Sequence, residues 1–144
     1  MTLDVLNAHL DLVTQLNMAR EMLQSMRDAV LRASTYDGMP HASGVSNKVE
    51  ALALKIEEQQ EVVNRYERIV KISETEIKEY IDTITDNRTN LIFHLRFICG
   101  LEWKDVADCV GGRNTEDAVK SVCYRYLQQE NASCALQRPK NSKE

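Results

Sequence analysis

Two long stretches of regularly spaced apolar residues fill the first half of the chain. In the first, residues 3–33, no Gly or Pro occurs, and apolar residues recur at alternating spacings of four and three. This spacing is typical of an α-helix that presents one apolar seam. The seam consists of Leu12, Leu16, Ala19, Leu23, Met26, Val30 and Ala33. Further apolar residues near its start lie on other faces, so we expect more than one neighbour to cover this helix.

The second stretch, residues 45–84, keeps the same spacing without a slip over more than five heptads. A sustained period of 3.5 residues favours a coiled coil, because it keeps one stripe facing a partner helix. Gln59 and Ser73 are polar positions in this seam. They either fix the register of the pairing or are half-exposed fillers.

The segment between the two stretches, STYDGMPHASG at 34–44, has the Gly, Pro and small polar residues of a loop. Helices at about 3–33 and 45–84 are therefore predicted to pair as a long antiparallel hairpin that occupies residues 1–85. The longer helix leaves part of its seam free to meet another chain. We expect the hairpin to dimerise or to bind a partner protein.

A short helix is predicted next, at about 87–99. Asp86 offers an N-cap, and Gly100 permits the left-handed turn that ends a helix. The apolar face expected to pack inward is Leu91, Leu95 and Ile98, with Ile92 and Phe93 beside it.

Two more short helices follow, at about 102–110 and about 115–128, with Gly111-Gly112-Arg113-Asn114 as the turn between them. Asn114 or Thr115 is the expected cap of the last helix. Helices joined by a Gly-containing turn describe a tri-helical helix-turn-helix domain over 86–128. Trp103 is expected to plug its small core. The fold class predicted for the chain is all-α, with a polar, disordered tail over residues 129–144.

The outward side of the last helix carries side chains that can read a DNA major groove. Lys and Arg reach guanine acceptors, Gln pairs with adenine, and Asp accepts from cytosine. The candidate DNA-binding residues are Arg113, Asp117, Lys120, Ser121, Tyr124, Arg125 and Gln128. The candidate phosphate contacts are Arg88, Arg96 and Lys104, which would position the protein without specifying sequence. The alternative interpretation of this side is a solvated polar face.

Charge divides the chain unevenly. Residues 1–85 carry 9 Lys or Arg and 14 Asp or Glu, whereas residues 86–144 carry 9 and 8. The more basic C-terminal part is consistent with protein contacts at one end and nucleic acid at the other. No apolar run approaches the ~20 residues of a membrane helix, and the N-terminus lacks the features of a signal peptide.

Catalysis is not expected. The four cysteines, Cys99, Cys109, Cys123 and Cys134, form no CxxC pair and are interpreted as reduced, mostly core thiols. His9, His41 and His94 lack metal-ligand spacing, and no Gly-rich phosphate loop or Ser-His-Asp set is present. We therefore expect no catalytic residues, no metal and no cofactor.

Two motifs carry a resemblance to a known family. LRFICGLEWKDVADCVG, residues 95–111, resembles the Leu-Arg-aromatic-Ile-x-Gly-Leu-x-Trp motif of small phage and prophage proteins related to region 4 of sigma-70 factors, grouped with late-gene transcriptional activators. DGMPHASGVSNKVEALALKIEE, residues 37–58, is similar to their Gly-Met-Pro loop. The family has Ser or Thr before the Trp where this chain has Glu102, and often Arg where it has Ser121.

The resemblance implies a phage-encoded regulator of transcription in the bacterial cytoplasm. Its helix-turn-helix would bind double-stranded DNA, while the hairpin forms a homodimer or meets a partner such as host RNA polymerase. No segment corresponds to the part of sigma factors that melts promoters. The alternative is a coiled-coil interaction or assembly protein, including a DNA-packaging type of adaptor, with a vestigial helix-turn-helix.

Overall fold

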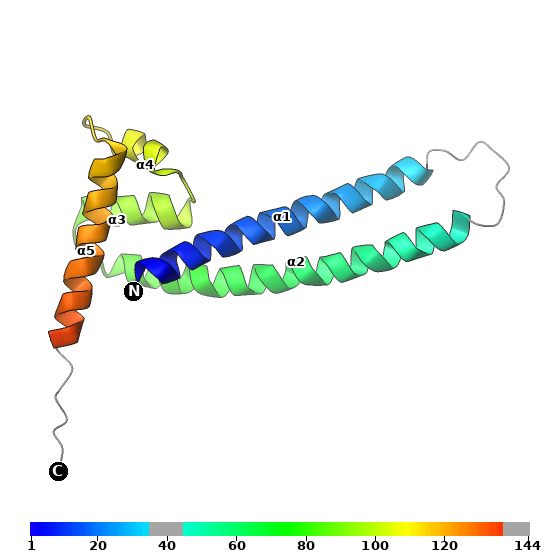
Figure 1. Ribbon diagram of the computed structural model, residues 1–144, viewed down its shortest axis with the longest axis horizontal. Coiled ribbons are helices and arrows are strands. Elements are labelled where there is room, and N and C mark those ends of the chain that lie inside the picture. Colours follow the sequence, from blue (N-terminus) through cyan, green and yellow to red (C-terminus); the bar gives the residue numbers. More distant parts are fainter. Residues whose placement is uncertain (35–44, 137–144) are drawn as a thin grey trace, which may run out of the picture. The chain divides into compact units, whose positions relative to one another are not determined.

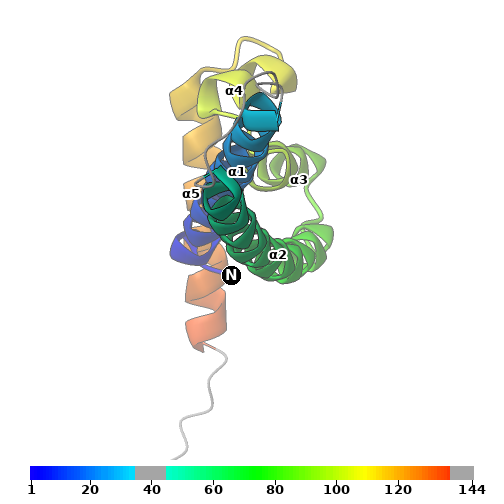
Figure 2. The ribbon, with the colours of Figure 1, turned by 90° about the vertical axis from the view of Figure 1, so that its right-hand side faces the viewer.

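The chain folds into helices throughout the part that the computed structural model describes, residues 1–34 and 45–136. The elements are α1 (Leu3–Ser34), α2 (Val45–Asp82), α3 (Asn87–Phe93), the π-helical turn η1 (His94–Ile98), α4 (Trp103–Val110) and α5 (Glu116–Leu136). Helices α1 and α2 pack together as a hairpin (Figures 1 and 2). The predicted all-α class and the predicted hairpin are confirmed.

Two compact units divide these elements. The hairpin unit is Asp11–Ile72, and the C-terminal unit joins Met1–Leu10 to the chain from Ser73 onward. The first turns of α1 and the last turns of α2 therefore belong with α3, α4 and α5. This division differs from the sequence-based boundary at residue 85, because α2 continues unbroken across the change of unit.

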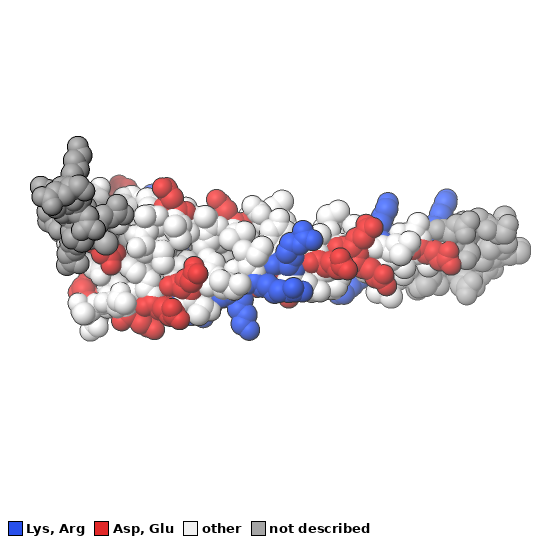
Figure 3. Space-filling view, turned by 90° about the horizontal axis from the view of Figure 1, so that it is seen from below, with Lys and Arg blue, Asp and Glu red and all other residues white. Residues whose placement is uncertain are grey.

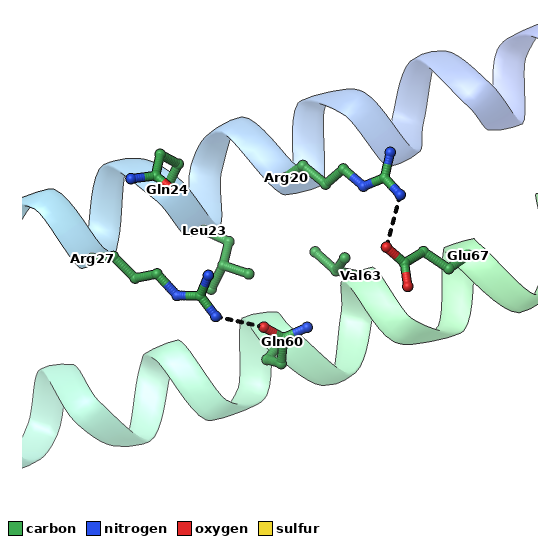
Figure 4. Close-up of a pocket in the computed structure, with 7 residues that line it drawn as sticks. All are labelled: Arg20, Leu23, Gln24, Arg27, Gln60, Val63 and Glu67. Carbon is green, nitrogen blue, oxygen red and sulfur yellow. Dashed lines mark hydrogen bonds and ion pairs between the residues drawn. The ribbon is translucent and has the colours of Figure 1, made fainter.

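The hairpin unit is held by an apolar seam with polar contacts along one side. Its core is Leu16, Ala19, Leu23, Val63 and Val70, all members of the two predicted seams. Along one side, Arg20 Nη2 lies 2.8 Å from Glu67 Oε1, and Arg27 Nη2 donates to Gln60 Oε1 at 2.8 Å (Figure 4). The residues of these two contacts line a pocket together with Gln24.

The two polar seam positions both bond to α1. Gln59 Nε2 donates to the carbonyl oxygen of Ala19 at 3.1 Å, within the hairpin unit. In the C-terminal unit, Ser73 Oγ lies 3.0 Å from Nδ1 of His9. A shift of α1 along α2 by one heptad would break both hydrogen bonds. The interpretation of these residues as register-fixing positions therefore agrees with the structure.

The C-terminal unit has one core to which all its elements contribute. Leu6 of α1 and Ile77 and Ile81 of α2 pack with residues of α3, η1, α4 and α5. The fully buried side chains at its centre are Phe93, Phe97, Leu6, Ile77, Ile92, Val106, Val119 and Cys123. On the α5 side, Val119, Cys123 and Leu127 recur at a spacing of four and form the buried face of that helix.

The buried face of the segment 87–99 differs from the predicted one. Leu91 is 43% exposed, whereas Ile92, Phe93 and Phe97 are fully buried. The predicted face rested on the spacing of Leu91, Leu95 and Ile98, which is that of one side of a regular α-helix. The actual face follows the aromatic residues, and the π-helical turn η1 changes the angular spacing between Phe93 and the residues after it.

Two further expectations need correction. Trp103, which was predicted to fill the centre of the core, is only half-buried at its edge. Phe97 occupies the centre instead. Helix α5 continues to Leu136, so residues 129–136 are helical and not part of a disordered tail. No Gly or Pro interrupts this stretch, and the Tyr80 hydroxyl donates to the Glu130 carboxylate two residues beyond the predicted end. Of the loop predicted at 34–44, Ser34 is the last residue of α1, and residues 35–44 lie outside the described residues, as do the tail residues 137–144.

Alanine substitutions at Phe97 and Leu91 distinguish the observed core from the predicted one. Phe97→Ala should lower the free energy of unfolding by about 3–5 kcal/mol, because it empties the centre of the C-terminal unit. Leu91→Ala removes a side chain that is 43% exposed, and it should lower the free energy of unfolding by about 1 kcal/mol or less. Urea unfolding followed by circular dichroism measures both. Equal losses in the two variants would contradict the observed packing.

His9 should make stability depend on pH. Burial lowers the pKa of its imidazole below the usual 6.5, against an opposing effect of the Glu74 carboxylate. The unfolded chain therefore binds a proton more readily than the folded one, and stability should fall as pH drops from about 7 through 6.5 and into the range of the lowered pKa. His9→Gln should reduce this slope in urea unfolding series between about pH 7 and 5. An unchanged slope in His9→Gln would contradict this assignment.

Candidate nucleic-acid interface

The turn between α4 and α5 is built from three consecutive left-handed residues. Gly111, Gly112 and Arg113 have φ values of 72°, 70° and 59°. Glycine adopts this conformation without a steric penalty, whereas arginine does so rarely. Asn114 secures the turn by donating from Nδ2 to the carbonyl oxygen of Gly111. The next residue, Thr115, accepts from Ala118 N at 3.3 Å and so caps α5 as predicted.

The bend between η1 and α4 is closed by Gly100 and Arg96. Gly100 has a φ of 69°, and the amide of Leu101 reaches back to the carbonyl oxygen of Leu95 at 3.1 Å. Arg96 Nη1 donates to the carbonyl oxygen of Leu101 at 2.7 Å, and its guanidinium lies 5.1 Å from the centre of the Trp103 ring. Such a charge-assisted bond with a cation–π contact holds α4 at its starting point. Arg96 was a candidate phosphate contact, but its guanidinium already binds groups within the C-terminal unit.

The starts of α3 and α4 are stabilised in different ways. Asp86 accepts from Thr89 N at 2.9 Å, and the hydrogen bonds from Thr89 lower the pKa of its carboxyl group. Glu102, at the N-cap of α4, makes no side-chain capping bond. The α4 start therefore depends on the Arg96 contacts more than on a cap of its own.

The outward side of α5 is exposed in the C-terminal unit. Asp117, Ser121, Tyr124, Arg125 and Gln128 are all exposed, and Arg113 precedes them in the turn. The structure thus brings the predicted residues of this helix onto one face. Within the same unit, the opposite side of α5 packs on α3 and α4.

Lys120 differs from the other residues of this face. It is half-buried and forms an ion pair with Glu116 one turn earlier, and the hydrogen bond that it donates to that carboxylate raises its pKa. Its charge is therefore partly neutralised. Tyr124 is held as well, because its ring meets Trp103 edge to face at 6.2 Å. Ser121, Arg125 and Gln128 keep the most freedom to meet a ligand.

Arg88 and Lys104 occupy different places. Arg88 Nη2 donates to Asn114 Oδ1 at 2.6 Å and ties the first turn of α3 to the left-handed turn. Sequence patterns gave no signal for this link, although an Asn directly after a Gly-Gly-Arg run is typical of a residue that bonds its own turn. Lys104 is exposed on the first turn of α4.

The charge of this region is close to balance. Residues 86–136 carry six Lys or Arg and seven Asp or Glu. Long-range attraction of phosphates is therefore weak, and any affinity for DNA has to come from contacts close to the groove.

Other chemistry has little support in the described residues. Within them, no group of three His, Cys, Asp or Glu side chains is gathered so as to hold a metal ion. Cys123 is the one described cysteine in the core, where burial raises its thiol pKa to about 12. Cys99 and Cys109 are exposed, contrary to the expectation of mostly core thiols. None of the described helices combines the length and apolar character needed to cross a membrane.

Comparisons with known proteins add no relative. No protein-family model, no curated protein and no solved structure matches this chain.

Arg96 should prove structural. Arg96→Gln removes the charged donor to Leu101 and the contact with Trp103, and should destabilise the C-terminal unit by about 1.5–3 kcal/mol. Trp103 is the single tryptophan of the chain, so its fluorescence during urea unfolding reports on this contact directly. Arg125→Gln, an exposed arginine on α5, is the matched control and should leave the midpoint unchanged. Unaltered unfolding of Arg96→Gln would argue against the assigned role.

Proposed function

We propose that this protein is a phage-encoded, DNA-binding regulator of transcription that acts in the cytoplasm of a bacterial host. The observation that carries the proposal is the exposed face of α5, where Ser121, Tyr124, Arg125 and Gln128 project from a helix whose other side is packed into the unit's core. The left-handed turn joins it to α4 in the manner of a helix-turn-helix.

In this proposal α5 enters the major groove of double-stranded DNA. Arg125 can donate to guanine, and Gln128 can bond adenine in a bidentate way. Asp117, near the start of the helix, would meet a cytosine amino group, since beside phosphates it would be repelled. Lys104 is the candidate phosphate contact that has no hydrogen bond or ion pair among the described residues, and Arg113, a candidate DNA-reading residue, has none there either.

The hairpin supplies the second half of the proposal. A homodimer formed through it would read two half-sites separated by about one helical turn of DNA or a multiple of that. Its remaining surface would then be open to a partner such as host RNA polymerase. Neither cofactor nor catalytic residue takes part in this mechanism.

A second candidate function is a coiled-coil interaction or assembly protein, including a DNA-packaging type of adaptor. The near balance of charge over residues 86–136 favours it, because most DNA-binding domains present an excess of basic residues. Met18 and Met22 also leave 64% and 53% of their surface exposed on α1, as a protein-binding helix would.

Titration of fluorescent duplex DNA tests the first candidate. Sites should first be selected from random sequence, and binding of the full chain then measured at about 50 and 200 mM salt. Arg125→Ala combined with Gln128→Ala should weaken binding to the selected site by roughly tenfold or more, since each base contact contributes about 1–3 kcal/mol. Affinity should also fall as salt rises, because phosphate contacts release counterions.

The matched control is Lys55→Ala, which removes one exposed charge from the hairpin unit and should leave DNA affinity unchanged. Absence of binding at low salt, or binding that the two α5 substitutions do not weaken, would reject the DNA-reading role and favour the second candidate.

A further inference from the structure

The outer side of α2 carries a stripe of six residues opposite its seam. The seam residues Ile56, Val63 and Val70 pack toward α1. Half a turn around the helix, at alternating spacings of four and three, lie Leu54, Glu58, Glu61, Arg65, Arg68 and Ile72. All six are exposed, and the two apolar residues at its ends, Leu54 and Ile72, are 62% and 63% exposed.

The order of residue types in this stripe is apolar, acidic, acidic, basic, basic, apolar. When the stripe is reversed end to end, every acidic position falls on a basic one and each apolar end falls on the other. Figure 3 looks onto this side of the hairpin and shows a group of Lys and Arg directly beside a group of Asp and Glu. The pattern is symmetric about position 63, so its centre lies at the same height along the helix axis as Val63.

Two of the three neighbouring charge pairs in this stripe are unfavourable within one helix, and only Glu61 and Arg65, four residues apart, attract each other. Glu58 and Glu61 are three residues apart, as are Arg65 and Arg68, so each pair places like charges side by side. A face that only interacts with water gains from alternating signs at these spacings. In the described residues, no ion pair or hydrogen bond joins any of these four side chains to another group.

We propose that this stripe is a self-association surface that binds the same stripe of a second copy of this chain, with the two α2 helices antiparallel. Glu58 then lies opposite Arg68 of the second copy, and Glu61 opposite Arg65 of the second copy. Leu54 meets Ile72 of the second copy at each end. Two-fold symmetry makes every contact occur twice, as an isologous interface requires.

The neighbouring stripe agrees with the same arrangement. Glu57, Asn64 and Lys71 follow one another at heptad spacing beside the first stripe. In an antiparallel pair of helices, residues that flank the contact face meet their own counterparts across it. Glu57 therefore faces Lys71 of the second copy, while Asn64 lies near the two-fold axis and faces Asn64 of the second copy.

The symmetry of the pattern identifies the occupant. A different protein with a complementary surface would need only an acidic group and a basic group, in any order and at any spacing. Here three pairs in one stripe share a single centre, which is a requirement only when the chain binds itself. The proposal specifies the dimerisation surface of the proposed regulator, yet it does not depend on DNA binding.

Charge reversal tests the surface with variants that should each fold. Glu58→Arg with Glu61→Arg makes the stripe uniformly basic, and Arg65→Glu with Arg68→Glu makes it uniformly acidic. Each variant should self-associate at least about tenfold more weakly than the natural chain, because like charges face each other across the helix pair. An equimolar mixture of the two should regain the dimer. The chain with all four reversals should also dimerise, since its stripe is again self-complementary.

Sedimentation equilibrium over a concentration series, without DNA, measures these masses at about 50 mM and about 500 mM NaCl. The natural dimer should weaken at the higher salt, because exposed ion pairs are screened. The matched control is Asp11→Arg with Glu21→Arg, two exposed acidic residues on α1, whose mass should equal that of the natural chain. Circular dichroism verifies that every variant is helical.

A natural chain that is monomeric at every concentration would overturn the proposal. So would a dimer that both double reversals leave intact, or a mixture of the two variants that stays monomeric. These results are read without DNA, so they are distinguishable from failure of the DNA-binding role.

Discussion

A chain of aromatic contacts centred on Phe93 holds the C-terminal unit together. The Phe93 ring meets Tyr80 of α2 at 6.1 Å, Phe97 of η1 at 5.6 Å and Tyr126 of α5 at 5.8 Å. Phe97 continues the chain to Trp103 of α4, and Trp103 continues it to Tyr124 on the outer face of α5. Edge-to-face aromatic pairs are directional, so they fix angles between helices as well as contact. A continuous path of ring contacts thereby joins the candidate interface to the last turns of α2.

Polar contacts complete this arrangement where aromatic ones end. Burial and the hydrogen bond to Glu130 both raise the pKa of the Tyr80 hydroxyl, which keeps it protonated as the donor that fastens the second half of α5. Ser73 and His9 set the register of α1 against α2 in the same unit, and Gln59 does so in the hairpin unit. The outer stripe of α2 keeps its position relative to the seam because both belong to one continuous helix.

Heptad spacing was sufficient to predict α1, α2 and their pairing, because a long unbroken period has few alternative explanations. Local signals also located Asp86, Gly100 and Thr115 at helix ends. The interior of the short helices was harder to predict. Nothing in a linear pattern indicates a π-helical turn, and without it Leu91 looks as good a core residue as Phe97. The end of α5 was missed because its polar composition resembles a tail, whereas the contact that extends it comes from Tyr80, fifty residues earlier in the chain. For the candidate site, exposure of the α5 face followed from helix periodicity, but the intramolecular roles of Arg88 and Arg96 required coordinates.

The two proposals constrain each other through α2. The stripe lies within the hairpin unit, whereas the aromatic core and the α5 face belong to the C-terminal unit of each copy. The near balance of charge in residues 86–136 then matters, since a single face offers few phosphate contacts and would bind DNA weakly alone. Joining two such faces converts the second binding event into an intramolecular one, which raises overall affinity without any new contact. Under the two proposals together, DNA affinity would depend on a weak, salt-sensitive pairing of the α2 helices, and occupancy of a DNA site would rise steeply with protein concentration.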